Sequence, residues 1–304
     1  MIDYKEFKTM ILSRLKKALA DETTEVIEES IPKINRTLDA VVIKEKNKDE
    51  GMTIGRIIDF DILYHEYMEG VDVETIIDKI QNSARKQAPE KIQFEKIFSF
   101  AYCKEHLTAQ VIAKEENMKF LERVVHRKVL NLALIYRVML IEEDNETASI
   151  VVTKQMLKDW GISEDMLYQI AWENAAKNAP YRIQNLYDLF LGLEENTEDD
   201  DHEENQSRRI PPMYVISQGK GYFGASALAY PEAMRQAFAV FGEDFFLLPS
   251  SQQELIAVPF DKTEIENLKA IVCEINHTSV SKEEWLSDSV YYYDHEADEV
   301  RPAA

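Results

Sequence analysis

The side chains with the clearest capacity for chemistry lie in a polar turn, residues 249–254, between two apolar runs. The turn carries two hydroxyls and a carboxylate, those of Ser250, Ser251 and Glu254. A serine nucleophile needs an adjacent base and an orienting acid, but no histidine lies nearby in the sequence and no GxSxG motif is present. Serines at such a turn commonly bond backbone groups. We therefore predict a structural turn, with these three residues as candidates for ligand binding.

A second chemical candidate is GKGYFG at 219–224, which matches the GxGxxG pattern of dinucleotide-binding turns. Too few residues follow it for a full dinucleotide-binding fold. Tyr222 and Phe223 also occupy positions where the backbone would have to approach a phosphate closely. We expect no dinucleotide here, and we predict a turn at which Lys220 and a helix N-terminus could hold one anionic group.

Metal-ligating residues show no recognised pattern. Cys103 and Cys273 lie far apart in the sequence, and none of the six histidines forms an HxxxH or HExxH pair. Cys103 and His106 have the spacing of half a zinc site, without a second half. We therefore expect no metal site and no cofactor, and we assign no catalytic residue.

An aromatic segment near the C-terminal end, DSVYYYD at 288–294, favours a strand. Core packing and an edge position would explain most of its aromatic side chains. Exposed tyrosines are also effective contact residues in interfaces. Tyr291, Tyr292 and Tyr293 are accordingly our candidates for binding a protein partner.

The hydrophobic pattern predicts both helices and strands. Helices are expected over 4–20, 59–68, 73–86, 154–160, 164–178, 225–241 and 265–276, the sixth interrupted or kinked at Pro231. Thr153 and Ser163 are expected to cap the fourth and fifth helices. Strands are expected over 24–29, 37–44, 149–152, 213–217, 245–248, 254–258 and 290–293. Residues 107–113 and 128–142 are strongly apolar, and periodicity leaves strand and helix open for the second.

An acidic segment interrupts these elements. Residues 194–206 hold eight acidic and no basic side chains, a composition typical of a solvated disordered linker. We predict a linker over 194–210, preceded by an N-terminal α+β domain (1–115) and a middle strand–helix region (116–193), and followed by a C-terminal α+β domain (211–304). The predicted fold class is α+β, with mixed helices and mostly antiparallel sheets in two lobes separated by this linker.

The net charge of −21 limits the classes of partner. Such a chain is repelled by phosphate backbones and by anionic membranes, and its basic runs at 123–128 and 208–209 are short. No apolar run of about 18 residues is present to span a membrane, and the first residues lack an apolar signal segment. We expect a cytoplasmic protein that binds a protein partner and does not bind nucleic acid directly.

Five stretches, at 152–174, 211–215, 224–231, 248–254 and 286–294, are similar to the bacterial family of unknown function DUF5688. Together they span most of the chain, and their order is specific. The resemblance implies a cytoplasmic bacterial protein, often encoded near mobile elements, and no known activity. Relatives commonly carry His-Glu where this chain has Gln253-Glu254. Because glutamine exchanges no proton near neutral pH, this difference argues against catalysis at the turn.

Two functional classes follow. We favour a non-catalytic binding or regulatory protein with an acidic partner-binding surface, linked to mobile elements by the resemblance. One version is an inhibitor that mimics nucleic acid and occupies a basic groove. The alternative is a small-ligand-binding or hydrolytic enzyme with a pocket at the turns running from Gly219 to Gly224 and from Pro249 to Glu254.

Overall fold

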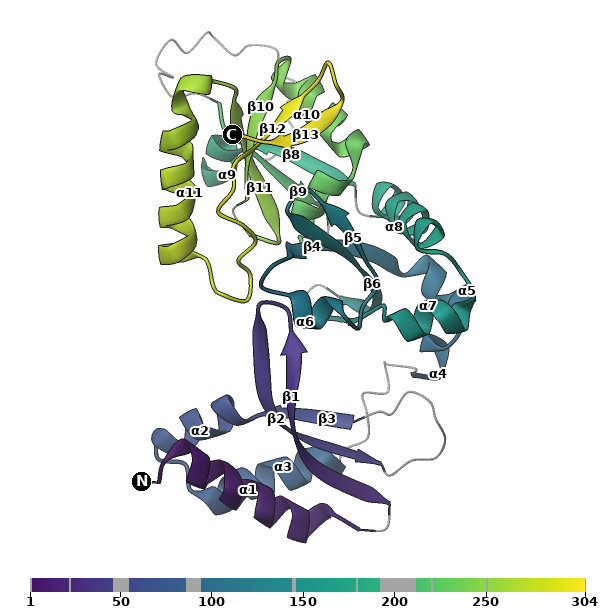
Figure 1. Cartoon of the computed structure of the whole chain (residues 1–304), viewed down its shortest axis with the longest axis vertical. Coiled ribbons are helices and arrows are strands. Elements are labelled where there is room, and N and C mark those ends of the chain that lie inside the picture. The colour runs from purple at the N-terminus through teal and green to yellow at the C-terminus, as the bar shows by residue number, and fades with distance from the viewer. Residues whose placement is uncertain are drawn as a thin grey trace. The chain divides into compact units, whose positions relative to one another are not determined.

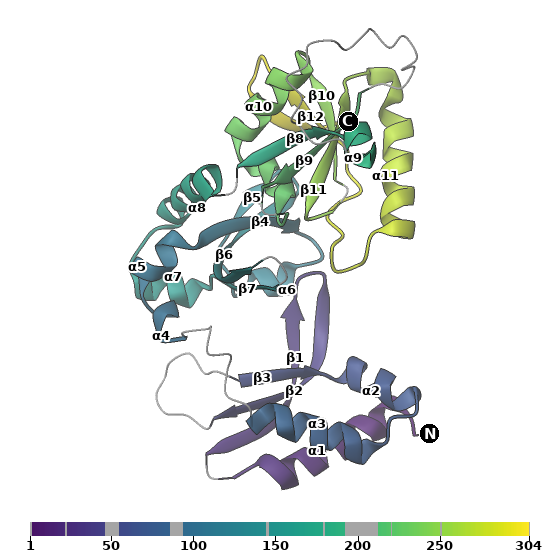
Figure 2. The ribbon, with the colours of Figure 1, turned by 180° about the vertical axis from the view of Figure 1, so that it is seen from behind.

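The computed structural model describes residues 2–21, 23–45, 55–85, 94–143, 146–178, 180–191, 212–219, 221–249 and 251–303. The chain divides into two compact units, Met1–Ile92 and Gln93–Ala304. The elements of both units are visible from opposite sides in Figures 1 and 2. The predicted acidic linker, 194–210, lies outside the described residues.

The first unit is built on a three-stranded antiparallel sheet of order β1-β2-β3. Its described elements are α1 (Tyr4–Leu19), β1 (Thr24–Lys33), β2 (Arg36–Glu45), β3 (Gly55–Asp59), α2 (Phe60–Met68) and α3 (Val73–Arg85). The predicted helices over 4–20, 59–68 and 73–86 are confirmed, each with one end shifted by a single residue.

One apolar core holds this unit together. The Asp3 carboxylate caps α1 by accepting the N–H of Glu6 at 2.8 Å. Helical spacing then places Phe7, Ile11 and Leu15 of α1 on one buried face. They join side chains of β1, β2, α2 and α3 in a single cluster, and full burial of each large side chain contributes about 1.5–3 kcal/mol.

The second unit begins with a four-stranded antiparallel sheet. It contains β4 (Leu107–Ala113), β5 (His126–Val129), β6 (Leu132–Glu143) and β7 (Glu146–Val151), in the order β4-β6-β5, with β7 also paired to β6. The apolar run at 128–142, left open by its periodicity, is therefore mostly strand. Residues 132–136 of β6 are buried on both faces of the sheet. A strand covered on both faces reads as a continuous apolar run, and this is why its periodicity is uninformative.

The helices around this sheet are α4 (Phe94–Ile97), α5 (Phe100–Glu105), α6 (Met118–Leu121), α7 (Lys154–Trp160) and α8 (Glu164–Asn178). Both predicted caps are confirmed. Thr153 Oγ1 accepts the N–H of Met156 at 3.1 Å, and Ser163 Oγ accepts that of Met166 at 3.2 Å. The three short helices α4, α5 and α6 were not predicted, because a helix of one or two turns has too few residues to show a period.

The rest of the second unit is a six-stranded antiparallel sheet of order β13-β12-β10-β11-β9-β8. Its elements are β8 (Tyr181–Asn185), α9 (Leu186–Leu191), β9 (Tyr214–Gln218), the 3-10 helix η1 (Gly224–Ala229), α10 (Pro231–Phe241), β10 (Phe245–Leu248), β11 (Glu254–Pro259), the 3-10 helix η2 (Lys262–Glu264), α11 (Ile265–Ser279), β12 (Tyr291–Asp294) and β13 (Glu299–Pro302). Helices together with these antiparallel sheets confirm the α+β fold class.

The helix predicted over 225–241 is interrupted at Pro231, one of the two outcomes expected there, and its first part is a 3-10 helix. The chain forms η1 up to Ala229, becomes extended at Tyr230 (φ −125°, ψ 105°), and begins α10 at Pro231. The proline ring clashes with the helical conformation of the residue before it. Pro231 therefore opens a helix at its first position, where its missing N–H costs no hydrogen bond.

The sheets also show where the predicted domain limits fall. Strand β4 pairs with β6 across position 115, and β8 pairs with β9 across the 194–210 segment. Both predicted divisions therefore lie inside the second compact unit. Within the described residues, no helix combines the length and apolar character that crossing a membrane requires.

The helix η1 joins the two sheets of the second unit. Ser226 is 1% exposed. Its Oγ accepts the N–H of Val111 and donates to the carbonyl of Ala109, both at 3.1 Å, so it supplies partners to the outer edge of β4. The N–H of Gly224 donates to the carbonyl oxygen of Gln253 at 2.8 Å. A Cβ on Gly224 would lie 2.3 Å from that oxygen, and therefore only glycine fits.

We predict that Gly224→Ala lowers the unfolding free energy by about 3 kcal/mol, because the added methyl forces the backbones of η1 and the 249–254 turn apart. Gly221→Ala is the matched control. A Cβ at Gly221 meets nothing within 4 Å, and its cost is confined to the left-handed φ of +77°, about 1 kcal/mol. Denaturant unfolding of the full chain measures both. Equal losses for the two variants would contradict the close approach at Gly224.

Candidate functional site

The 249–254 turn has an architectural role in the part that the structure describes. Lys220 and Ser250 lie outside the described residues. Ser251 Oγ accepts the N–H of Gln253 at 3.0 Å, the backbone bond expected of a serine at a turn. Gln253 Oε1 in turn accepts the N–H of Phe223 at 3.0 Å. The 219–224 and 249–254 turns thus contact each other through backbone hydrogen bonds.

Gln252 extends this joint into the interior. It is 3% exposed. Its Oε1 accepts from Gln110 Nε2 at 2.6 Å, and its Nε2 donates to the carbonyl of Glu283 at 2.8 Å. Gln110 Oε1 accepts from Arg137 Nη1 at 2.9 Å, and burial lowers the pKa of the Arg137 guanidinium to about 10. This chain of amides connects β4, β6, the turn and the 281–289 loop.

Glu254 begins β11, which lies between β10 and β9 in the sheet. A sheet edge, where a charged side chain is common, is therefore excluded as the position of Glu254. Its cross-strand partner is Ser217 of β9. Burial raises the pKa of its half-buried carboxyl above the usual value.

Strand β12 divides the three candidate tyrosines. Tyr291 and Tyr293 are 0% and 3% exposed. Their hydroxyls donate to Asn131 Oδ1 and Asp298 Oδ1, each at 2.7 Å. Tyr292 points to the opposite face of the sheet and is half-buried. Among the three, it is Tyr292 that a partner could reach.

Tyr292 lines a hollow of about 540 Å³ that we call the acid-aromatic pocket. The residues that matter for its chemistry are Asp244, Phe246, Phe260, Lys262, Tyr292, Asp294, His295 and Glu296. They come from β10, η2, β12 and the turns beside them. Its volume falls within the range of about 300–1,000 Å³ usual for ligand sites.

The aromatic side of this pocket is formed by Phe260 and Tyr292, with the fully buried Phe246 packed against Phe260. The ring of Phe260 lies 4.7 Å from that of Phe246 and 5.4 Å from that of Tyr292, centroid to centroid. The Nζ of Lys262 lies 5.8 Å from the Phe260 centroid. The chain thus already places one cation against this aromatic surface, an arrangement that the ring quadrupole favours.

Three carboxylates, those of Asp244, Asp294 and Glu296, line the pocket with the single ammonium of Lys262. Asp244 Oδ1 accepts the backbone N–H of His295 at 3.0 Å and lies 2.8 Å from His295 Nδ1. Asp294 Oδ2 lies 2.8 Å from Arg301 Nη1. Glu296 is exposed. Carboxylates beside an aromatic surface favour a cationic ligand group over an anionic one.

Sequence reasoning singled out Tyr292 and none of the other pocket residues as a contact site. Phe260 and His295 carry no motif, and they meet Asp244 only because β10 lies between β11 and β12. The acid excess of the whole chain was the one signal that pointed toward such a pocket.

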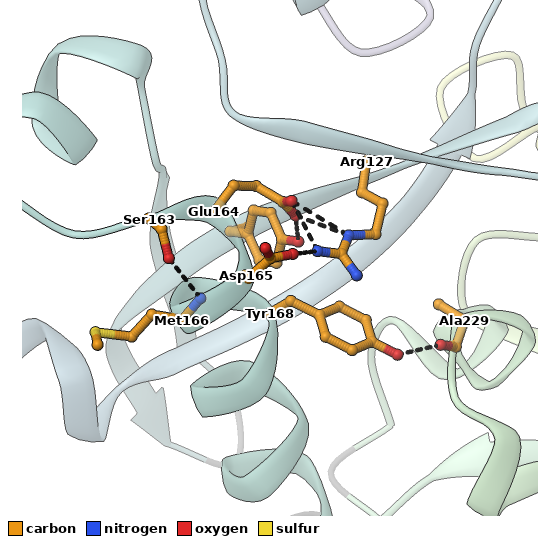
Figure 3. A network of polar contacts seen from close by, with 8 residues as sticks. Arg127, Ser163, Glu164, Asp165, Met166, Tyr168 and Ala229 are labelled. Carbon is orange, nitrogen blue, oxygen red and sulfur yellow. Dashed lines mark hydrogen bonds and ion pairs between the residues drawn. The ribbon is translucent and has the colours of Figure 1, made fainter.

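A second polar cluster, drawn in Figure 3, ties β5 to α8. Arg127 Nη2 lies 2.8 Å from Glu164 Oε2 and also pairs with Asp165. The guanidinium lies 4.3 Å from the ring centroid of Tyr168, whose hydroxyl donates to the carbonyl of Ala229 at 2.8 Å. The charge of this basic residue is thus neutralised within the fold, so the 123–128 run is less basic than its sequence indicates.

We predict that Glu254→Gln stabilises the protein at neutral pH. A carboxyl whose pKa is raised on folding binds its proton more tightly in the folded state, so stability falls as pH rises through the unfolded pKa of about 4.3 toward the folded one. The Tm gain of the variant should therefore be largest at pH 7 and vanish below about pH 4. A lower Tm for Glu254→Gln at pH 7 would instead show that the carboxylate makes a stabilising contact.

We predict that Arg127→Ala lowers the unfolding free energy by about 2 kcal/mol, because it removes charged hydrogen bonds and the contact with Tyr168. Arg127→Lys should recover only part of this, since an ammonium cannot make the paired bonds to Glu164. Arg235→Ala, which breaks exposed ion pairs with Glu232 and Asp298, is the control and should lower stability by less, because solvent screens exposed charges more. If both alanine variants cost the same, the Arg127 cluster is no more than surface charge.

A family model matches residues 4–295, nearly the whole chain. The matched family is described as a family of unknown function, DUF5688. No curated protein and no solved structure matches the chain. The matched region includes the two contacting turns, strand β12 and most of the acid-aromatic pocket. The chain therefore belongs to the DUF5688 family.

Proposed function

We propose that this chain is a non-catalytic binding protein whose acid-aromatic pocket receives a lysine or arginine side chain of a partner protein. The observation that carries this proposal is the combination of three carboxylates with the rings of Phe260 and Tyr292 in one hollow. From the resemblance, we also propose that it acts in the bacterial cytoplasm, in a setting linked to mobile elements.

Charge supports a basic partner at two scales. The net charge of −21 attracts a basic protein over long range. Within the pocket, the aromatic rings remove water from the cation while the carboxylates balance its charge. Because interfaces draw most of their affinity from a few anchored side chains, one cation in this pocket could fix the partner. A nucleic-acid-mimicking inhibitor that fills a basic groove is a special case of this proposal.

The position of Lys262 adds a further element to the proposal. Its ammonium lies against the ring of Phe260, where an incoming cation would bind. A ligand must therefore displace Lys262 or share the pocket with it. Removing this side chain should strengthen binding of a cation, whereas removing a pocket carboxylate should weaken it.

The test uses a fluorescent oligo-arginine peptide as the probe, and polarisation as the measurement. We predict that Glu296→Gln and Tyr292→Leu each weaken binding roughly five-fold, the value of about 1 kcal/mol for one cation–π or charge contact. Lys262→Ala should tighten it, and binding should weaken as salt is added.

Asp159→Asn is the control, because Asp159 is an exposed carboxylate on α7, outside the lining of the pocket. It should bind the peptide like the unmodified protein. If the pocket variants bind as tightly as Asp159→Asn, the peptide is responding to overall charge and the pocket proposal fails. Weaker binding by Lys262→Ala would equally count against it.

The alternative, a ligand-binding or hydrolytic site at the two contacting turns, has one supporting observation, the raised pKa of Glu254. Raised carboxyl pKa values are common at active sites. The hydrogen bonds of Ser251 and Gln253 favour the architectural role of these turns instead.

A further inference from the structure

Cys273 and His277 lie one turn apart on α11. Residues four apart on a helix share a face, and Cys273 Sγ lies 3.7 Å from His277 Nδ1. Both residues are exposed. A thiol and an imidazole are therefore adjacent on a surface that solvent reaches.

Asp288 reaches the same place from the loop that follows the helix. Residues 280–290 turn back alongside α11 (Figures 1 and 2). Asp288 Oδ1 accepts from Asn276 Nδ2 at 2.9 Å and from Trp285 Nε1 at 3.0 Å. The buried Asn276 also donates to the carbonyl of Ser287 at 2.9 Å. These bonds fix one carboxylate oxygen and leave the other for a further ligand.

We infer that Cys273, His277 and Asp288 form a binding site for a zinc-type divalent cation. One possible ligand atom of each lies within 4.8 Å of the other two. Zn–S and Zn–N bonds of about 2.3 and 2.05 Å at a tetrahedral angle place sulfur and nitrogen about 3.6 Å apart. The distance of 3.7 Å between Cys273 Sγ and His277 Nδ1 matches this edge.

The donor set selects the class of metal. Thiolate and imidazole favour Zn²⁺ and its chemical relatives over Mg²⁺ and Ca²⁺, which prefer oxygen. On binding, the Cys273 thiol loses its proton to solvent. His277 Nδ1 lies 2.7 Å from the carbonyl of Cys273 and donates its proton to that oxygen. When Nδ1 binds the metal instead, this hydrogen bond is lost and the imidazole takes the tautomer protonated on Nε2.

Three protein ligands leave a fourth tetrahedral position for water or an external group. The second shell is already in place, because Asn276 and Trp285 orient Asp288 in the manner of partners that support metal-bound carboxylates. Bound metal would also link the C-terminal half of α11 to the loop at 285–288. The site is separate from the acid-aromatic pocket, which meets α11 only near its first residue, Ile265.

Cys103 provides an internal control. It is buried, its Sγ donates to the carbonyl of Ile97 at 3.2 Å, and burial raises the pKa of its thiol to about 11. It is therefore a poor ligand and a poor nucleophile. The Cys103–His106 pair, whose spacing alone resembles half of a zinc site, is thus less suited to metal than the C-x-x-x-H pair on α11.

The test titrates the reduced, chelator-treated full chain with Co²⁺. We expect visible bands of tetrahedral cobalt with a near-ultraviolet thiolate-to-cobalt band, and we expect Zn²⁺ to displace both. Cys273→Ser and His277→Asn should abolish the bands. Asp288→Asn, which keeps an oxygen for Asn276 and Trp285, should weaken Co²⁺ affinity at least about ten-fold.

Cys103→Ser should bind Co²⁺ like the unmodified protein. In a second measurement, Zn²⁺ should raise the Tm of the unmodified protein and protect Cys273 from a thiol reagent, but leave the Tm of Cys273→Ser unchanged. Absence of the cobalt bands in the unmodified protein, or their persistence in Cys273→Ser, would overturn the site.

Discussion

The second unit depends on the contact between η1 and the 249–254 turn, where two backbones approach too closely for any side chain on Gly224. Ser226 completes the open edge of β4, while the N–H of Gly224 bonds to the turn that connects β10 to β11. Both sheets consequently share one apolar core, which includes side chains of β4, β6, α8, η1, α10 and β10. The glycine-rich stretch that resembles a phosphate-binding turn is thus explained by packing between the two sheets.

This joint also accounts for the residues of the 249–254 turn. The side-chain amides of Gln252 and Gln253 fit this joint, because the oxygen of each accepts one hydrogen bond. A serine at position 251 caps the backbone. Polar residues that look like a reactive constellation in the sequence are here satisfied by backbone and amide groups. An unpaired buried polar group costs free energy. The polar groups of a turn that lies between two sheets therefore need hydrogen-bond partners within the protein.

Neither proposed binding site includes a residue of the two contacting turns, although the loop that carries Asp288 is bonded to Gln252 through the carbonyl of Glu283. The acid-aromatic pocket uses the face that carries Phe246 and Tyr292, and the Cys273 cluster uses the exposed face of α11. In both, a rigid element holds one side chain and a neighbouring turn brings the others to it. Binding groups on loops that a stable scaffold positions are the common arrangement in proteins.

The α+β class, most helices and strands, the caps at Thr153 and Ser163 and the acidic balance can be predicted from the residues alone, because they depend on local periodicity, local hydrogen bonds and composition. The sequence left 128–142 open, because a strand buried on both faces has no period to read. Only the tertiary structure decided that Tyr292 is accessible while Tyr291 and Tyr293 are buried, and that Asp244 meets His295 and Asp288 meets Cys273. These pairs are far apart in the sequence or lie on different elements, and their meeting follows from strand order and chain return, which no local pattern encodes.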